Sequence, residues 1–237
     1  MLGISTFCLI GEPLAQALDR IAAVTGSIEV MDEGPHSLSN AEPLLSHSCR
    51  FSIHAPCRGT NLASLLEPIR RASVAVMEEC FVVAAEVDAE VVVHPGYFAW
   101  PGERAPAEVR LRRSVTELTA AAKEYGVRYF IENMGNWEYF FLKTPDELPL
   151  IDGCGFALDV GHAHQNHCLP AFLPLPAGHY HLHDNDAKAD SHWQVGKGTI
   201  DFRPVMAAVK RTGGLPVIEV ADFDGAVQSL HMLEPML

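Results

Sequence analysis

The sequence has little positive charge and no long apolar run. Seventeen Lys and Arg face thirty Asp and Glu, which gives a formal net charge of −13. Because a protein that binds phosphate backbones needs Lys and Arg, the negative net charge argues against nucleic acid as a partner. No apolar stretch approaches the length of a membrane-spanning helix, so we expect no membrane partner either.

The sequence also lacks paired cysteines and a phosphate-binding glycine loop. Its six cysteines are scattered, without Cys-x-x-Cys spacing. The first residues, MLGISTFCLIGEP, lack the basic region and long apolar core of a secretory signal. We therefore expect a reduced, cytoplasmic protein. No Gly-rich loop follows the first expected strand, which argues against a doubly wound nucleotide-binding sheet.

What is present is a regular alternation of short apolar runs and amphipathic segments in a chain of 237 residues, 48% of them hydrophobic. Helices are predicted over 13–24, 62–86 and 106–125, with a helical turn or two in 163–177. The predicted strands are 3–9, 27–33, 50–56, 90–96, 127–134, 155–162, 178–184 and 215–220. Eight strands separated by helices predict an α/β fold, a single (β/α)8 TIM barrel that spans residues 1–237.

Polar residues concentrate between residues 156 and 198, which hold seven of the twelve histidines and four aspartates. Asp159 and His162 form an Asp-x-x-His pair after an apolar run. Strand periodicity puts His179, His181 and His183 on one face. Buried carboxylates and imidazoles need partners, and a divalent cation supplies all of them at once, so the stretch predicts a metal site.

The same chemistry recurs along the chain at the carboxyl ends of the predicted strands. A closed barrel brings these ends around one centre, on the face where such barrels carry their active sites. We therefore expect the metal site at the C-terminal face of the strands. The residues at these ends are His54, His94, Glu132, Asp159, His162, His181 and Glu219.

Seven motifs in order resemble the xylose isomerase-like TIM-barrel superfamily, which includes AP endonuclease family 2 (the endonuclease IV type) and the sugar phosphate isomerases and epimerases. The resemblance covers the chain from about residue 50 onward. The motifs are HAP (54–56), VVHPG (92–96), IENMG (131–135), LDVGHAH (158–164), HLHD (181–184), DSHWQVGKGTIDF (190–202) and VIEV (217–220).

The resemblance implies a set of metal ligands and one to three divalent ions. Zinc is expected first for a histidine-rich set, and manganese, cobalt or iron would also suit such ligands. A single-metal isomerase would use Glu132, Asp159, His181 and Glu219. His183 rivals His181, which we favour for its H-x-x-D register with Asp184. The full endonuclease IV-like set is His54, His94, Glu132, Asp159, His162, His181, Asp190, His192 and Glu219.

Two mechanisms follow from the resemblance, and we favour the first. A metal-dependent isomerase or epimerase would act on a small sugar, sugar phosphate or polyol ketone through a metal-bound enediolate, with Glu132 and Glu219 moving the proton. A multinuclear zinc hydrolase would cleave a small phosphoester or abasic DNA. The ligand count favours the hydrolase, but the acidity and short loops disfavour DNA. A metal-binding barrel without catalysis is the third alternative.

Three further residues are candidates for substrate contact: His183, Trp137 and Lys197. The family often has Gly-Glu-Gly where this chain has Gly196-Lys197-Gly198. A lysine near the mouth would meet a phosphate or carboxylate of the substrate, and a solvated loop lysine explains it equally well. The substrate is not readable from these residues, and an oligomer is compatible with them.

Overall fold

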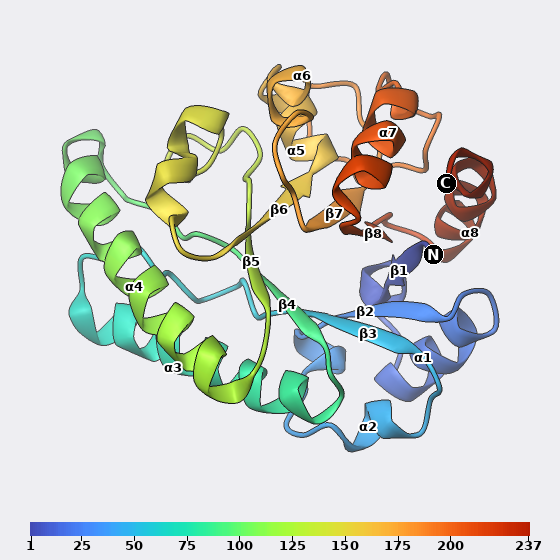
Figure 1. Ribbon diagram of the computed structural model, residues 1–237, viewed down its shortest axis with the longest axis horizontal. Coiled ribbons are helices and arrows are strands. Elements are labelled where there is room, and N and C mark those ends of the chain that lie inside the picture. Colours follow the sequence, from blue (N-terminus) through green and yellow to red (C-terminus); the bar gives the residue numbers. More distant parts are fainter.

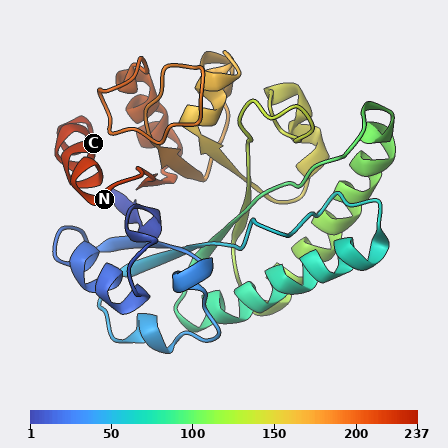
Figure 2. The same cartoon turned by 180° about the vertical axis from the view of Figure 1, so that it is seen from behind.

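The eight strands form a closed, all-parallel barrel in sequence order, wrapped by helices (Figures 1 and 2). The computed structural model describes residues 1–237. β8 pairs with β1, so that Val217 is opposite Gly3 and the sheet closes. The strands are β1 Gly3–Ser5, β2 Ser27–Met31, β3 Arg50–His54, β4 Glu90–Val93, β5 Tyr129–Glu132, β6 Gly155–Asp159, β7 His179–Leu182 and β8 Leu215–Ile218. The predicted TIM barrel is confirmed.

The helices differ greatly in length around the barrel. The connection from β5 to β6 holds only a 3-10 helix, Pro145–Ile151, and the connections that lead into β3 and β7 hold only helices of one or two turns. The α-helices are α1 Leu14–Ala22, α2 Glu42–Leu45, α3 Glu67–Glu86, α4 Arg104–Tyr125, α5 Val160–Gln165, α6 Leu169–Phe172, α7 Phe202–Thr212 and α8 Phe223–Leu233.

All eight predicted strands and two of the predicted helices are longer than the observed elements, and three of these differences have a clear local reason. The strand expected over 3–9 ends at Ser5, whose hydroxyl accepts the Phe7 N–H and starts a 3-10 helix. The helix expected over 62–86 begins at Glu67, because the Asn61 side chain accepts the Ala63 N–H and holds a turn before it. The strand expected over 155–162 ends at Asp159, where α5 begins at once.

The apolar core lies mainly between the barrel and its helices. A cluster of 61 buried hydrophobic residues occupies this outer layer. A separate cluster of three, Val92, Phe130 and Ala157, sits on the strand faces that also carry His94, Glu132 and Asp159. Strand periodicity therefore puts a largely polar set of side chains inside the barrel.

A buried arginine joins the two longest helices, α3 and α4, which lie side by side in both views (Figures 1 and 2). Arg70 is fully buried, and its guanidinium donates to Glu67 on its own helix at 2.8 Å and 2.9 Å. It also donates to Glu117 at 2.7 Å and to Ser114 at 2.9 Å, both on α4. The side chain thus ties α3 to α4 through charge-assisted hydrogen bonds.

We expect Arg70→Met to lower the free energy of unfolding by about 2 kcal/mol, because it leaves two half-buried carboxylates without their main partner. Arg71→Met is the matched control, since Arg71 is exposed and forms no ion pair. Urea denaturation of both variants measures the effect. Equal stability of the two variants would contradict the structural role of Arg70.

Two further properties bear on the expectations from sequence. No helix is both long enough and apolar enough to cross a membrane. All six cysteines are free thiols, and only Cys8 and Cys80 are buried.

Candidate functional site

A cavity of about 960 Å³ opens at the carboxyl ends of the strands. Seven of the nine predicted ligands line it: His54, His94, Glu132, His162, Asp190, His192 and Glu219. The other two, Asp159 and His181, are fully buried and contact this group from outside the cavity lining. The barrel and the loop after β7 therefore bring all nine residues together at the carboxyl ends of the strands.

Glu132, the last residue of β5, lies among four imidazoles. Its Oε2 is 3.4 Å from His54 Nε2 and 3.3 Å from His94 Nε2. Its Oε1 is 3.2 Å from His162 Nδ1 and 3.4 Å from His181 Nδ1. Burial alone would raise the pKa of Glu132, but the surrounding imidazoles, His181 foremost, hold that pKa well below its usual range. The carboxylate is thus ionised, and it contributes to two groups of ligands. His54 and His94 at its Oε2 form the first group with it.

A second group surrounds the Nδ1 atom of His181. Glu132 Oε1, Glu219 Oε2 and Asp159 Oδ2 lie 3.4 Å, 3.6 Å and 3.9 Å from it. These are the four residues of the single-metal set. His181, rather than His183, is therefore the strand-seven imidazole that contacts both Glu132 and Glu219.

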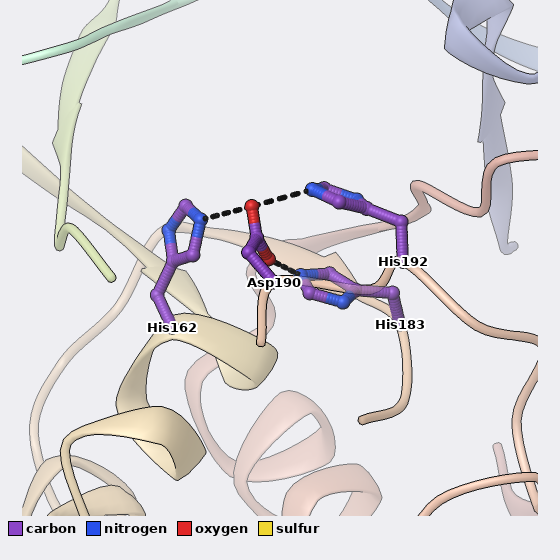
Figure 3. A group of neighbouring side chains, drawn as sticks. All are labelled: His162, His183, Asp190 and His192. Atoms are coloured by element: carbon purple, nitrogen blue, oxygen red, sulfur yellow. Dashed lines mark hydrogen bonds and ion pairs between the residues drawn. The ribbon is translucent and has the colours of Figure 1, made fainter. Parts of the chain in front are cut away.

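A third group forms around Asp190, in the loop after β7 (Figure 3). Its Oδ2 lies 3.4 Å from His162 Nε2 and 3.0 Å from His192 Nε2. His183 Nε2 lies 3.8 Å from Asp190 Oδ1 and 3.1 Å from Asp159 Oδ1. The His183 ring also stacks on His192, with 3.9 Å between centroids. The structure thus puts His183 with the third group, buried and outside the cavity lining.

The Asp-x-x-His pair lies where β6 ends and α5 begins. Asp159 is the N-cap of α5, and its Oδ1 accepts the His162 N–H. Asn133, directly after β5, fixes this junction: its Oδ1 accepts the Asp159 N–H at 2.8 Å, and its Nδ2 donates to the Asp159 carbonyl at 2.9 Å. A Cβ at Gly161 would collide with the His183 ring. The Asp-Val-Gly-His sequence therefore fixes the positions of Asp159 and His162, and its glycine leaves room for the His183 ring.

The loop that carries Asp190 and His192 is anchored by Asp184. The Asp184 Oδ2 accepts the N–H groups of Gly196 and Gly198, each at 2.9 Å. Asp184, the aspartate of the H-x-x-D motif, therefore holds the backbone of this loop in place. Lys197, between the two held glycines, is exposed and does not line the cavity.

Trp137, a candidate for substrate contact, lines the cavity. Its ring lies edge-on to His162, with 5.3 Å between centroids, and Phe140 packs beside it at 5.5 Å. On the side of β1, Phe7 lies 5.0 Å from the His192 ring. Aromatic side chains thus flank the third group on two sides of the cavity.

Sequence reasoning missed two kinds of residue near the site. Asn133 stands inside the quoted IENMG motif, and its place beside Glu132 was the available signal. Glu29 is a single carboxylate in the middle of the apolar strand β2, and it is fully buried. An acidic residue directly between the apolar Ile28 and Val30 of a strand is the signal that could have found it.

The ligand atoms themselves fit a divalent cation. Glu132 Oε2, His181 Nδ1 and Asp190 Oδ1 are buried and have no hydrogen-bond partner. A buried polar atom without a partner costs free energy, and a cation between such atoms removes that cost. Mixed imidazole and carboxylate donors suit zinc, manganese, iron or cobalt. The second and third groups each contain at least three residues whose ligand atoms lie within 4.8 Å of one another. In the first group, the ligand atoms of His54 and His94 lie within 4.8 Å of each other, and both lie within 3.4 Å of Glu132 Oε2.

Comparison with known proteins gives a consistent family. The model of the xylose isomerase-like TIM barrel family matches residues 41–236. An uncharacterized protein of Methanocaldococcus jannaschii is 32% identical over 201 residues, which is 82% of this chain and 78% of that protein. A probable endonuclease 4 of Mycobacterium leprae is 26% identical over 80% of each chain.

A solved structure of a D-tagatose 3-epimerase-like protein is similar over almost the whole fold. It covers 99% of this chain and 96% of its own, with a TM-score of 0.92 and 28% sequence identity. The structural similarity supports an enzyme of the sugar isomerase and epimerase kind. Together with the closed barrel and its motifs, these matches confirm the resemblance read from the sequence, and the chain belongs to the xylose isomerase-like TIM-barrel family.

Proposed function

We propose that the protein is a divalent-metal-dependent epimerase or isomerase of a small sugar, and that Glu132 and Glu219 move the proton. The observation that carries the proposal is the pair of carboxylates on either side of His181, at 3.4 Å and 3.6 Å from its Nδ1. Both carboxylates line the cavity, where a substrate would meet them. The likeness to a D-tagatose 3-epimerase-like protein supports the same chemistry.

The positions of the two glutamates suit proton transfer at one carbon. Glu132 ends β5 and Glu219 follows β8, so two strands separate them around the barrel. One carboxylate can remove a proton from one face of a carbon beside a carbonyl, and the other can return a proton to the opposite face. Glu132, Asp159, His181 and Glu219 would hold the cation. When bound, it supplies Lewis-acid polarisation of the substrate oxygens.

Solvent exchange tests this proposal directly. Ketoses are incubated with metal-loaded protein in D₂O and followed by NMR. The expected result is deuterium at one carbon next to the carbonyl, together with the epimer or the isomeric aldose. Absence of exchange across free and phosphorylated ketoses, with hydrolysis of a phosphodiester by the same preparation, would reject it.

A phosphoester hydrolase is the second candidate because all nine endonuclease IV-like ligands converge. The first group, His54 and His94 against Glu132 Oε2, and the third group, around Asp190, are not needed by a single-metal isomerase. The likeness to a probable endonuclease 4 supports this alternative. Several ions at such spacing would activate water and stabilise a phosphoester in line.

Metal content distinguishes the two candidates. For the single-metal epimerase, we expect one ion per chain after purification without chelator, and no change in His54→Ala or His94→Ala, because neither imidazole belongs to the single-metal set. Elemental analysis measures the content, with the exposed His231→Ala as control. Two or three ions per chain, falling by about one in both variants, would favour the hydrolase.

A further inference from the structure

A column of alternating acidic and basic side chains runs through the barrel below the site. It begins at His181, whose Nε2 lies 3.0 Å from Glu29 Oε1. Glu29 Oε2 lies 2.9 Å from His179 Nε2, and His179 Nδ1 lies 3.0 Å from Glu90 Oε1. Arg128 then donates to Glu90 Oε2 at 2.8 Å. We call these five residues the interior column.

Four of the five residues of the interior column are buried and have no direct route to a substrate, while Arg128 is exposed at the far end. Glu29, His179 and His181 are 0% exposed, and Glu90 is 3% exposed. None of these four residues lines the cavity. A buried ion pair is on balance no more stabilising than apolar side chains of the same volume, so fold stability alone does not explain four such residues in one barrel.

Glu29 is the member of the column that touches a proposed ligand. The two nitrogens of His181 face opposite ways: Nε2 faces Glu29, and Nδ1 faces Glu132, Asp159 and Glu219. A carboxylate at one ring nitrogen favours the tautomer with its proton on that nitrogen, which leaves the other nitrogen free to bind a cation. Glu29 is itself held by the Ser52 hydroxyl, which donates to its Oε2 at 3.0 Å.

We propose that Glu29 is a positioning residue, which fixes the ring of His181 so that Nδ1 is presented to the metal site. The rest of the column does not contact His181 through its carboxylates: His179 lies between Glu29 and Glu90 and offsets their charge, and Arg128 donates to Glu90 at the amino-terminal end of β5. The inference rests on the proposed metal dependence. It adds a residue that acts only through His181.

The test is Co²⁺ titration of chelator-treated protein, followed by visible absorbance and without any substrate. We expect Glu29→Gln to weaken Co²⁺ binding by about 10- to 100-fold, the range found when a residue that orients a metal-bound side chain is replaced. Glu90→Gln is the matched control, because Glu90 is also buried and belongs to the same column but forms no ion pair with His181. Its Co²⁺ affinity should stay close to that of the wild type, even if its melting temperature falls.

Two results would overturn the proposal. One is unchanged Co²⁺ affinity in folded Glu29→Gln, and the other is an equal loss of affinity in Glu29→Gln and Glu90→Gln, which would indicate general loosening of the barrel. If Glu29→Gln does not fold, Glu29→Asp keeps the charge but withdraws the carboxylate from His181, and it should lower the affinity in the same direction. Failure of the epimerase proposal would show as absent exchange in D₂O with Co²⁺ binding intact.

Discussion

Glu132→Gln should lower epimerase turnover by about 10³-fold or more, because a neutral amide cannot act as a general base. The substitution also removes the charge that faces His54, His94, His162 and His181 in the centre of the site. Turnover is measured by NMR on the ketose that exchanges in D₂O. Glu138→Gln, an exposed residue in the loop after β5, is the control and should keep full activity.

Glu219→Gln tests whether the mechanism uses two bases. With one of two bases removed, the epimer whose proton faces Glu132 should still exchange with solvent, while formation of the other epimer stops. If both epimers still interconvert in Glu219→Gln, the two-base mechanism is wrong. Metal content of both variants, measured in parallel, separates loss of the base from loss of the ion.

Removal of the metal should cost both activity and stability. A ligand that binds only the folded state at about a thousand times its dissociation constant stabilises that state by about 4 kcal/mol, which corresponds to roughly 10 °C in melting temperature for a domain of this size. The buried, unpartnered Glu132 Oε2 and His181 Nδ1 are the physical reason to expect this dependence.

The measurement is a thermal scan before and after dialysis against a chelator, with turnover recorded on the same samples. Addition of Zn²⁺, Mn²⁺ or Co²⁺ should restore both quantities, and the most effective ion identifies the working metal. A chelated protein with unchanged melting temperature and full turnover would contradict metal dependence. Asp159→Asn should respond weakly to added ion, since Asp159 belongs to the single-metal set.

The barrel and most of the site could be predicted because their signals are periodic or local. The alternation of His179, His181 and His183 placed three imidazoles on one strand face, and the structure confirms that they all face acidic partners inside the barrel. The convergence of strand ends followed from the closed barrel itself. No long-range information was needed for either prediction.

Other parts depend on contacts between distant segments. The start of α3 is shifted by Asn61, which bonds to the backbone of Tyr97, 36 residues away. The exposure of Lys197 follows from the hold of Asp184 on the flanking glycines. Glu29 resembles a solvent-facing residue until the barrel closes around it, because its partners His179 and His181 come from β7. Such pairings become visible only once the strands are arranged in space.

The separation of the apolar layer outside the barrel from the polar column inside it affects how the protein can change. Substitutions that improve packing around α3 and α4 act on the outer layer and leave the ligand geometry alone. Substitutions inside the barrel alter ligand orientation before they alter packing. Thermostable variants selected for retained activity should therefore accumulate changes on the helices and keep the inward residues of the strands. Tolerance to mutation should be higher outside the barrel than inside it.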